Sequence, residues 1–110
     1  MERRVGLRAR TDFGVIARQG HRRSRCRGIE LGANGIVVDQ GRSTRPLAER
    51  LLVDLELRLP ERIRVLHAVA RPVWSYGTQH ALRFVRISDV DRLTLAEHMD
   101  LLRLRGAPLA

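Results

Sequence analysis

Apolar and polar residues alternate along much of the chain, as is typical of β-strands that bury one face. The alternation is clearest over residues 51–59, where one face consists of Leu51, Val53, Leu55, Leu57 and Leu59. Shorter runs predict further strands over 12–17, 26–31, 36–38, 63–74 and 81–87. Six short strands are therefore expected.

Asn34-Gly35 stands between two of these apolar runs. Both residue types tolerate the positive φ of a tight turn, so the pair predicts a β-hairpin. On the same pattern, Trp74 is expected in the core, Cys26 as a buried small residue of a strand, and His67 as a half-buried residue of an inward face.

A single helix is expected to close the chain. Ser88 resembles an N-cap, and acidic residues follow it in the first turn. Leu93, Ala96, Met99 and then Leu102 or Arg103 recur at helical spacing. The predicted fold class is mainly β: a small six-stranded antiparallel β-barrel with one C-terminal α-helix.

The length of 110 residues fits one domain over 1–110. Within it we expect a flexible, arginine-rich arm over 1–11, the barrel over 12–87 and the helix over 88–105. The 44% of hydrophobic residues is enough for a real core.

Positive charge is concentrated near the start of the chain. Residues 1–27 hold nine arginines against Glu2 and Asp12, which gives +7 of the net charge of +9. This gradient predicts an anionic partner: nucleic acid, a phosphorylated small molecule, an acidic protein or a membrane surface. Few aromatic residues are present for base stacking, which disfavours nucleic acid.

Several classes of protein are not favoured. No apolar run approaches the roughly 18 residues of a membrane helix, and no signal segment follows Met1, so a cytoplasmic protein without membrane insertion is expected. Cys26 has no partner for a disulfide, and the four histidines lack metal-ligand spacing. No catalytic motif is found, so we expect neither an enzyme nor a cofactor or metal.

Two short segments define the candidate site. Arg3-Arg4-Val5-Gly6-Leu7-Arg8 is followed some 22 residues later by Glu30-Leu31-Gly32-Ala33-Asn34-Gly35. Together they resemble the two signature motifs of the PilZ family, RxxxR and (D/N)xSxxG. The similarity continues through the alternating strand, the 70–74 segment, the 82–84 segment and the closing helix.

Resemblance to PilZ implies a six-stranded barrel that binds cyclic di-GMP, a bacterial second messenger, often as an intercalated dimer. Arg4 and Arg8 match the two arginines of the first motif, and Arg3 matches a frequent additional one. An arginine can stack on guanine, pair with its O6 and N7, or bind a phosphate.

In the second motif Glu30 stands where the family has Asp or Asn, Gly32 where it has Ser, and Gly35 matches. A carboxylate at Glu30 would accept hydrogen bonds from guanine, whereas Gly32 lacks the hydroxyl and forfeits a bond worth about 0.5–1.5 kcal/mol. Ala81 stands where the family often has Gly. The predicted ligand site consists of seven residues of the two motifs: Arg3, Arg4, Arg8, Glu30, Gly32, Asn34 and Gly35.

The first hypothesis is a receptor or adaptor that binds cyclic di-GMP, changes its N-terminal arm and signals to an unidentified effector protein. The alternative is a degenerate PilZ-like module that does not bind the nucleotide and regulates motility or polarity through protein contacts. A free barrel face or the helix would also allow a homodimer.

Overall fold

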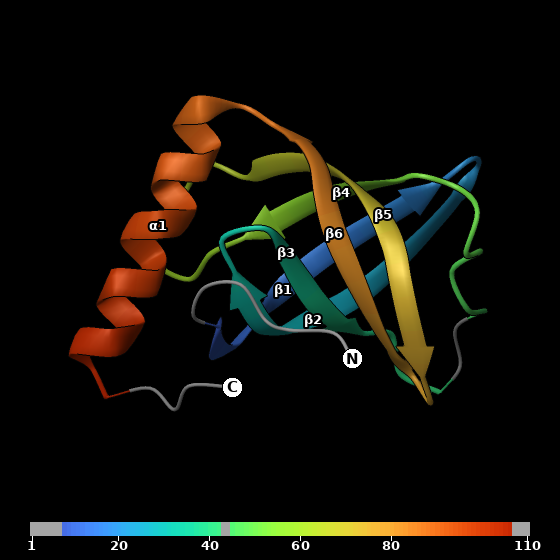
Figure 1. Cartoon of the computed structure of the whole chain (residues 1–110), viewed down its shortest axis with the longest axis horizontal. Helices are drawn as coiled ribbons and strands as arrows, with labels where there is room; N and C mark the ends of the chain where they lie inside the picture. Colours follow the sequence, from blue (N-terminus) through green and yellow to red (C-terminus); the bar gives the residue numbers. More distant parts are fainter. Residues whose placement is uncertain (1–7, 43–44, 107–110) are drawn as a thin grey trace.

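Six strands close into an antiparallel barrel, and one helix lies across an end of it (Figure 1). The computed structural model describes residues 8–42 and 45–106. In chain order the elements of this part are β1 (Arg8–Gln19), β2 (Arg22–Gly32), β3 (Gly35–Asp39), β4 (Val53–Arg58), β5 (Leu66–Tyr76), β6 (Gln79–Ile87) and α1 (Asp89–Leu104). Around the barrel the order is β1-β2-β3-β6-β5-β4, and β4 pairs with β1 to close it. The predicted fold class is confirmed.

Irregularities in strand pairing help the sheet to curve into a barrel. The β1–β2 register shifts between Arg10 and Phe13, and the β5–β6 register shifts between Pro72 and Trp74. After the first shift, Phe13 lies opposite Gly28, where a Cβ atom would stand only 3.0 Å from the phenyl ring. Glycine at this position therefore makes room for the phenyl ring in the core.

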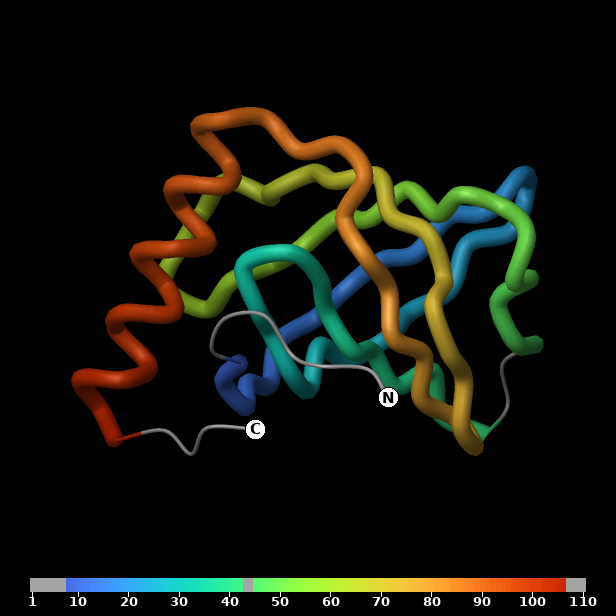
Figure 2. The backbone as a smooth tube through the Cα atoms, in the orientation of Figure 1, coloured from blue at the N-terminus to red at the C-terminus, as the bar shows by residue number. Residues whose placement is uncertain are grey.

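The barrel is filled by alternate strand residues and covered at both ends. Leu95 and Met99 of α1 and Leu47 of the β3–β4 connection belong to the core. Figure 2 shows α1 at one end of the barrel and the β3–β4 connection at the other. Gln19 fixes that connection, because its side chain donates to the Ala48 carbonyl at 2.7 Å and accepts from the Ala48 N–H at 2.8 Å. Both ends of the core are thus shielded from water.

Cys26 is buried in this core, as predicted. Burial, together with the negative charge of Asp39, raises the pKa of its thiol to about 11. Since the thiolate is the reactive form, this cysteine is a packing residue and a poor nucleophile at neutral pH.

Buried polar groups attach α1 to the barrel. His98 is 2% exposed; its Nδ1 is hydrogen-bonded to the Glu61 carboxylate, and its Nε2 lies 3.5 Å from the Thr11 hydroxyl. The imidazole also meets the ring of Phe13 edge-on. The helix position is therefore specified by directional bonds as well as by apolar packing.

Asp91 forms a second attachment, in the first turn of α1. Its carboxylate accepts a 3.2 Å hydrogen bond from the His67 N–H and pairs with Arg64 at 2.7 Å. Burial alone would raise the pKa of Asp91, but these partners outweigh it and hold the pKa below the usual range. The hydroxyl of Ser88 caps the helix by accepting from the Asp91 N–H at 3.1 Å, as the sequence predicted.

Two predicted boundaries are wrong. β1 begins at Arg8 and not at residue 12, because residues 8–10 pair with residues 30–32 of β2. Ala9 is buried, whereas its neighbours Arg8 and Arg10 lie on the outer face of the strand. Alanine is a weak signal of burial, so the sequence pattern does not separate this part from the predicted arm. Residues 1–7 of that arm lie outside the described part. β4 begins at Val53, and Leu51 is 54% exposed.

The inward faces of β5 and α1 also differ from prediction. β5 buries Leu66, Ala68 and Ala70, while His67 is exposed and Ile63 precedes the strand in contact with solvent. The buried face of α1 consists of Asp91, Leu95, His98 and Met99. Leu93 and Ala96 face solvent, because paired polar residues occupy two positions of the buried stripe.

None of the described helical residues forms a stretch long and apolar enough to cross a membrane.

Asp91→Asn is expected to lower the free energy of unfolding by about 1–2 kcal/mol at pH 7, because it removes a buried charge from two partners. A carboxylate whose pKa is depressed on folding stabilises the fold above its unfolded pKa, and this contribution is lost on acidification. The difference between the variant and the natural chain should therefore shrink below about pH 4. Urea unfolding of both proteins at pH 7 and pH 3 measures this difference in the free energy of unfolding. Asp89→Asn, in the same turn but exposed, serves as the control; an equal effect there would contradict the assignment.

Candidate ligand-binding site

A pocket of about 420 Å³ opens on the side of the barrel and collects the described residues of the predicted site. Its lining includes Arg8, Glu30, Gly32, Asn34 and Gly35. They come from the start of β1, the end of β2, and the turn into β3. The other two predicted residues, Arg3 and Arg4, lie outside the described part of the chain.

Arg8 and Glu30 meet on the outer face of the β1–β2 pair. Arg8 lies opposite Gly32 in the register, so Glu30 is its diagonal neighbour, two residues along the same face. The Arg8 Nη1 and Glu30 Oε1 atoms are 3.2 Å apart, and both side chains are partly exposed, at 31% and 22%. The two groups are thus held at the pocket wall within reach of solvent and of a ligand.

Gly35 allows β3 and β6 to approach closely. A Cβ atom at this position would stand well within 3.0 Å of the Leu82 carbonyl oxygen, a separation that real Cβ atoms essentially never show. The positive φ predicted for Asn34-Gly35 is not found: in the described residues only Gly20, Gly41, Gly77 and Gly106 have one. The glycine is needed for strand contact and not for turn conformation.

The β2–β3 turn is fastened from two sides. The Asn34 carbonyl accepts a 2.8 Å hydrogen bond from the Phe84 N–H of β6. The Ala33 carbonyl accepts a 3.2 Å bond from the guanidinium of Arg92, on α1. The turn that forms one wall of the pocket is therefore held by both the sheet and the helix.

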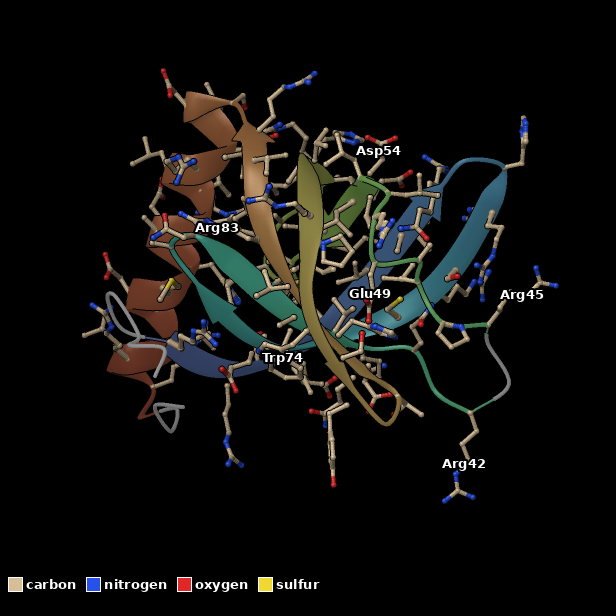
Figure 3. All side chains as sticks on the ribbon, turned by 45° about the vertical axis from the view of Figure 1, so that its right-hand side comes forward. Arg42, Arg45, Glu49, Asp54, Trp74 and Arg83 are labelled. Carbon is tan, nitrogen blue, oxygen red and sulfur yellow. The ribbon has the colours of Figure 1, made fainter. Side chains whose placement is uncertain are left out.

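The opposite wall comes from β5 and β6 and was largely missed by the sequence analysis. It consists of Val73, Trp74, Ala81, Leu82 and Arg83. Trp74 is 40% exposed and lines the pocket, so its expected place in the core is wrong. Figure 3 labels Trp74, on β5, and shows Arg83 beside the β2–β3 turn. Arg83 lies directly opposite Gly35 in the β3–β6 register.

This set of side chains suits a ligand that is both planar and anionic. Arg8 and Arg83 supply two guanidinium groups, Glu30 supplies a hydrogen-bond acceptor, and Trp74 supplies an aromatic face. Ile36, buried beneath the turn, contributes to an apolar base. Guanidinium groups bind phosphates bidentately and stack on aromatic rings, so nucleotides are the natural chemical class.

Comparison with known proteins agrees with this picture at the level of the fold. No protein-family model and no curated protein matches the chain. Among solved structures, the inhibitor of motility MotI/DgrA of Bacillus subtilis matches 96% of this chain with a TM-score of 0.78 and 18% identity. This chain spans 53% of the length of MotI/DgrA.

Two further structures show the same architecture. The PilZ domain of CeSA from a cellulose-synthesizing bacterium matches 87% of this chain and 97% of its own, with a TM-score of 0.67 and 13% identity. PlzA of Borreliella burgdorferi, solved in complex with cyclic di-GMP, matches 86% of this chain and 40% of its own, with a TM-score of 0.65 and 8% identity.

The closed barrel with its terminal helix is thus the fold of these three structures, one of which is a PilZ domain. The chain therefore has a PilZ-like fold.

Gly35→Ala is expected to lower the free energy of unfolding by about 1–3 kcal/mol, because the methyl group would collide with the backbone of β6. Gly14→Ala is the matched control, since nothing lies within 4 Å of a Cβ at that strand position. Urea denaturation of both variants makes the comparison. Equal stability of the two would show that β3 and β6 are not in close contact at Gly35.

Proposed function

We propose that the chain is a non-enzymatic, cytoplasmic receptor that binds cyclic di-GMP and acts on a partner protein. The observation that carries this proposal is the convergence of the described motif residues with Trp74 and Arg83 on one pocket of a PilZ-like barrel. The cyclic di-GMP complex of PlzA, which shares the fold, supports the choice of ligand.

Each side chain has a role that its chemistry supports. The Arg8 and Arg83 guanidinium groups would bind the phosphates or the guanine O6 and N7. The Glu30 carboxylate would accept from guanine N–H groups, and Trp74 would provide a stacking surface. Because Arg8 already pairs with Glu30, that ion pair would loosen or be shared when the ligand enters.

The arm is the part of the proposal that links binding to signalling. Arg3 and Arg4 precede β1, whose first residue, Arg8, is at the pocket. Their guanidinium groups would complete the binding of a dianionic ligand, taken up singly or as a dimer. Ordering of the arm over the pocket would then change the surface that an effector protein meets.

A second candidate function rests on the pocket's departures from the family motif. Gly32 offers no hydroxyl, and Ala81 places a methyl group in the lining. Arg8 and Glu30 satisfy each other without a ligand. A module with these features could serve motility or polarity through protein contacts alone, and a calorimetric titration separates the two functions.

Isothermal titration calorimetry with cyclic di-GMP is expected to give micromolar or tighter binding by the full chain. Arg8→Ala should weaken it about tenfold or more, because a charge-assisted contact is worth roughly 1.5–3 kcal/mol. Arg86→Ala removes an exposed arginine of β6 outside the pocket and should leave binding unchanged. Absence of binding by the natural chain would favour the protein-interaction module.

Trp74→Ala is expected to weaken cyclic di-GMP binding by roughly 5- to 150-fold, since stacking of one base on an aromatic ring contributes about 1–3 kcal/mol. Trp74→Phe should restore much of the loss because it keeps an aromatic face. Tyr76→Ala is the control, because Tyr76 is exposed on the same strand but does not line the pocket. Undiminished affinity of Trp74→Ala would remove Trp74 from the site.

A further inference from the structure

A second hollow lies on the outer face of β1, β2 and β4 and shares no lining residue with the candidate ligand site. Its volume is about 540 Å³. We refer to it as the arginine groove, after the side chains that dominate its lining: Arg23, Arg25, Arg27 and Arg58.

Gly14 is one of the residues that line the arginine groove. In the strand register Gly14 lies opposite Arg27 of β2 on one side and opposite Arg58 of β4 on the other, so it is flanked by two arginines. Nothing lies within 4 Å of a Cβ built on Gly14. A glycine within a strand, with open space above it, marks a place where another backbone can approach closely.

Ile16 lines the groove farther along β1. It lies opposite Arg25 in the register and is only 6% exposed, although its neighbours Val15 and Ala17 face the core. The groove therefore has an apolar base beneath a charged rim. Such a base favours a charged partner that can also bury side-chain or backbone atoms against the apolar surface.

The arginines of β2 form a regular row. Arg23, Arg25 and Arg27 are exposed, and the residues between them, Ser24 and Cys26, are buried. Alternate residues of a strand are about 6.6–6.8 Å apart on one face. Acidic side chains at alternate positions of another extended chain have the same spacing.

The row is only partly neutralised within the protein. Arg27 donates to Asp12 at 2.6 Å, and Arg58 lies 3.7 Å from Glu56. In the described part of the chain, Arg23 and Arg25 have no ion-pair partner. Among the lining residues, four arginines face one acid, Asp39, for a balance of 4 − 1 = +3.

We propose that the arginine groove binds an extended acidic segment of a partner protein, whose carboxylates at alternate positions face Arg23, Arg25 and Arg27. The backbone of the segment passes over the hollow at Gly14. This site lies beyond the receptor function proposed above, and it gives the domain a protein-binding surface separate from its nucleotide pocket.

Two observations favour an acidic protein segment over a nucleic acid. The lining of the arginine groove contains no aromatic residue on which a base could stack. Asp12, Asp39 and Glu56 stand among the arginines and would repel the continuous charge of a phosphodiester backbone. A peptide can place neutral residues at those points.

The test is an NMR titration of the full, isotope-labelled chain with a capped peptide in which glutamate alternates with serine. Amide shifts are expected at 23–27 and at Gly14, and not at 30–35. A peptide of the same composition with its glutamates in one block should bind several-fold more weakly, because only part of its charge can face the row. Equal binding of the two peptides would overturn the proposal.

Two variants of the chain locate the site. Arg25→Glu should weaken peptide binding about tenfold, because it replaces an attraction by a repulsion. Gly14→Leu should weaken it by filling the groove, while the open space above Gly14 lets the fold persist. Dispersed amide spectra of both variants would show that they are folded. Undiminished binding to Gly14→Leu would contradict occupation of the groove.

Arg86→Glu makes the same charge change on β6, outside both sites, and should alter peptide affinity less than twofold. An effect as large as that of Arg25→Glu would mean non-specific charge attraction and would overturn the proposal. So would tighter binding of duplex DNA with shifts at the same amides. Arg25→Glu should keep its affinity for cyclic di-GMP, so failure of the receptor proposal and failure of this one are distinguishable.

Discussion

The close approach of β3 and β6 at Gly35 is the constraint on which the candidate site depends. The strands β1, β2 and β3 follow one another around the barrel, as do β6, β5 and β4. These two halves are joined by the β3–β6 pairing on one side and by the β1–β4 pairing on the other. The pocket lies on this junction: Arg8 and Glu30 come from one half, Trp74 and Arg83 from the other. Without a glycine at residue 35 the two walls would separate.

The positive charge of the first 27 residues is divided between two faces once the chain is folded. Arg8 lies at the candidate ligand site, where β1 meets the end of β2. Arg23, Arg25 and Arg27 lie farther back along β2 and line the arginine groove. The positive charge that is concentrated near the start of the sequence thus contributes to two separate surfaces, and each surface could bind a different anionic partner.

The sequence predicted what depends on local pattern and spacing. The alternation from Val53 to Leu59 identified a barrel strand, and the resemblance to the two PilZ motifs identified Arg8 and Glu30, which do meet. It could not predict Trp74 and Arg83, whose place in the pocket depends on pairing across β5, β6 and β3 and on the irregularity next to Trp74. Apolar character alone suggested that Trp74 was in the core.

The helix was predicted in extent but not in orientation, for a comparable reason. Its buried stripe includes Asp91 and His98, whose burial is stabilised by partners on β5 and in the β4–β5 connection. A pattern based on apolar residues places the stripe on Leu93 instead. Long-range hydrogen bonds decide the face, and these are not encoded in local periodicity.

The contacts of the β2–β3 turn indicate which part of the domain could carry a signal. The turn contacts α1 through Arg92, which donates to the Ala33 carbonyl in an exposed position, where solvent screens the guanidinium charge and weakens the bond. The turn is also fixed to β6 through the Asn34 carbonyl, and the barrel itself is closed and well packed. A ligand in the pocket would therefore be expected to change the position of α1 and of the sheet only slightly. In the proposed receptor, a partner that recognises the bound state should therefore contact the arm that carries Arg3 and Arg4.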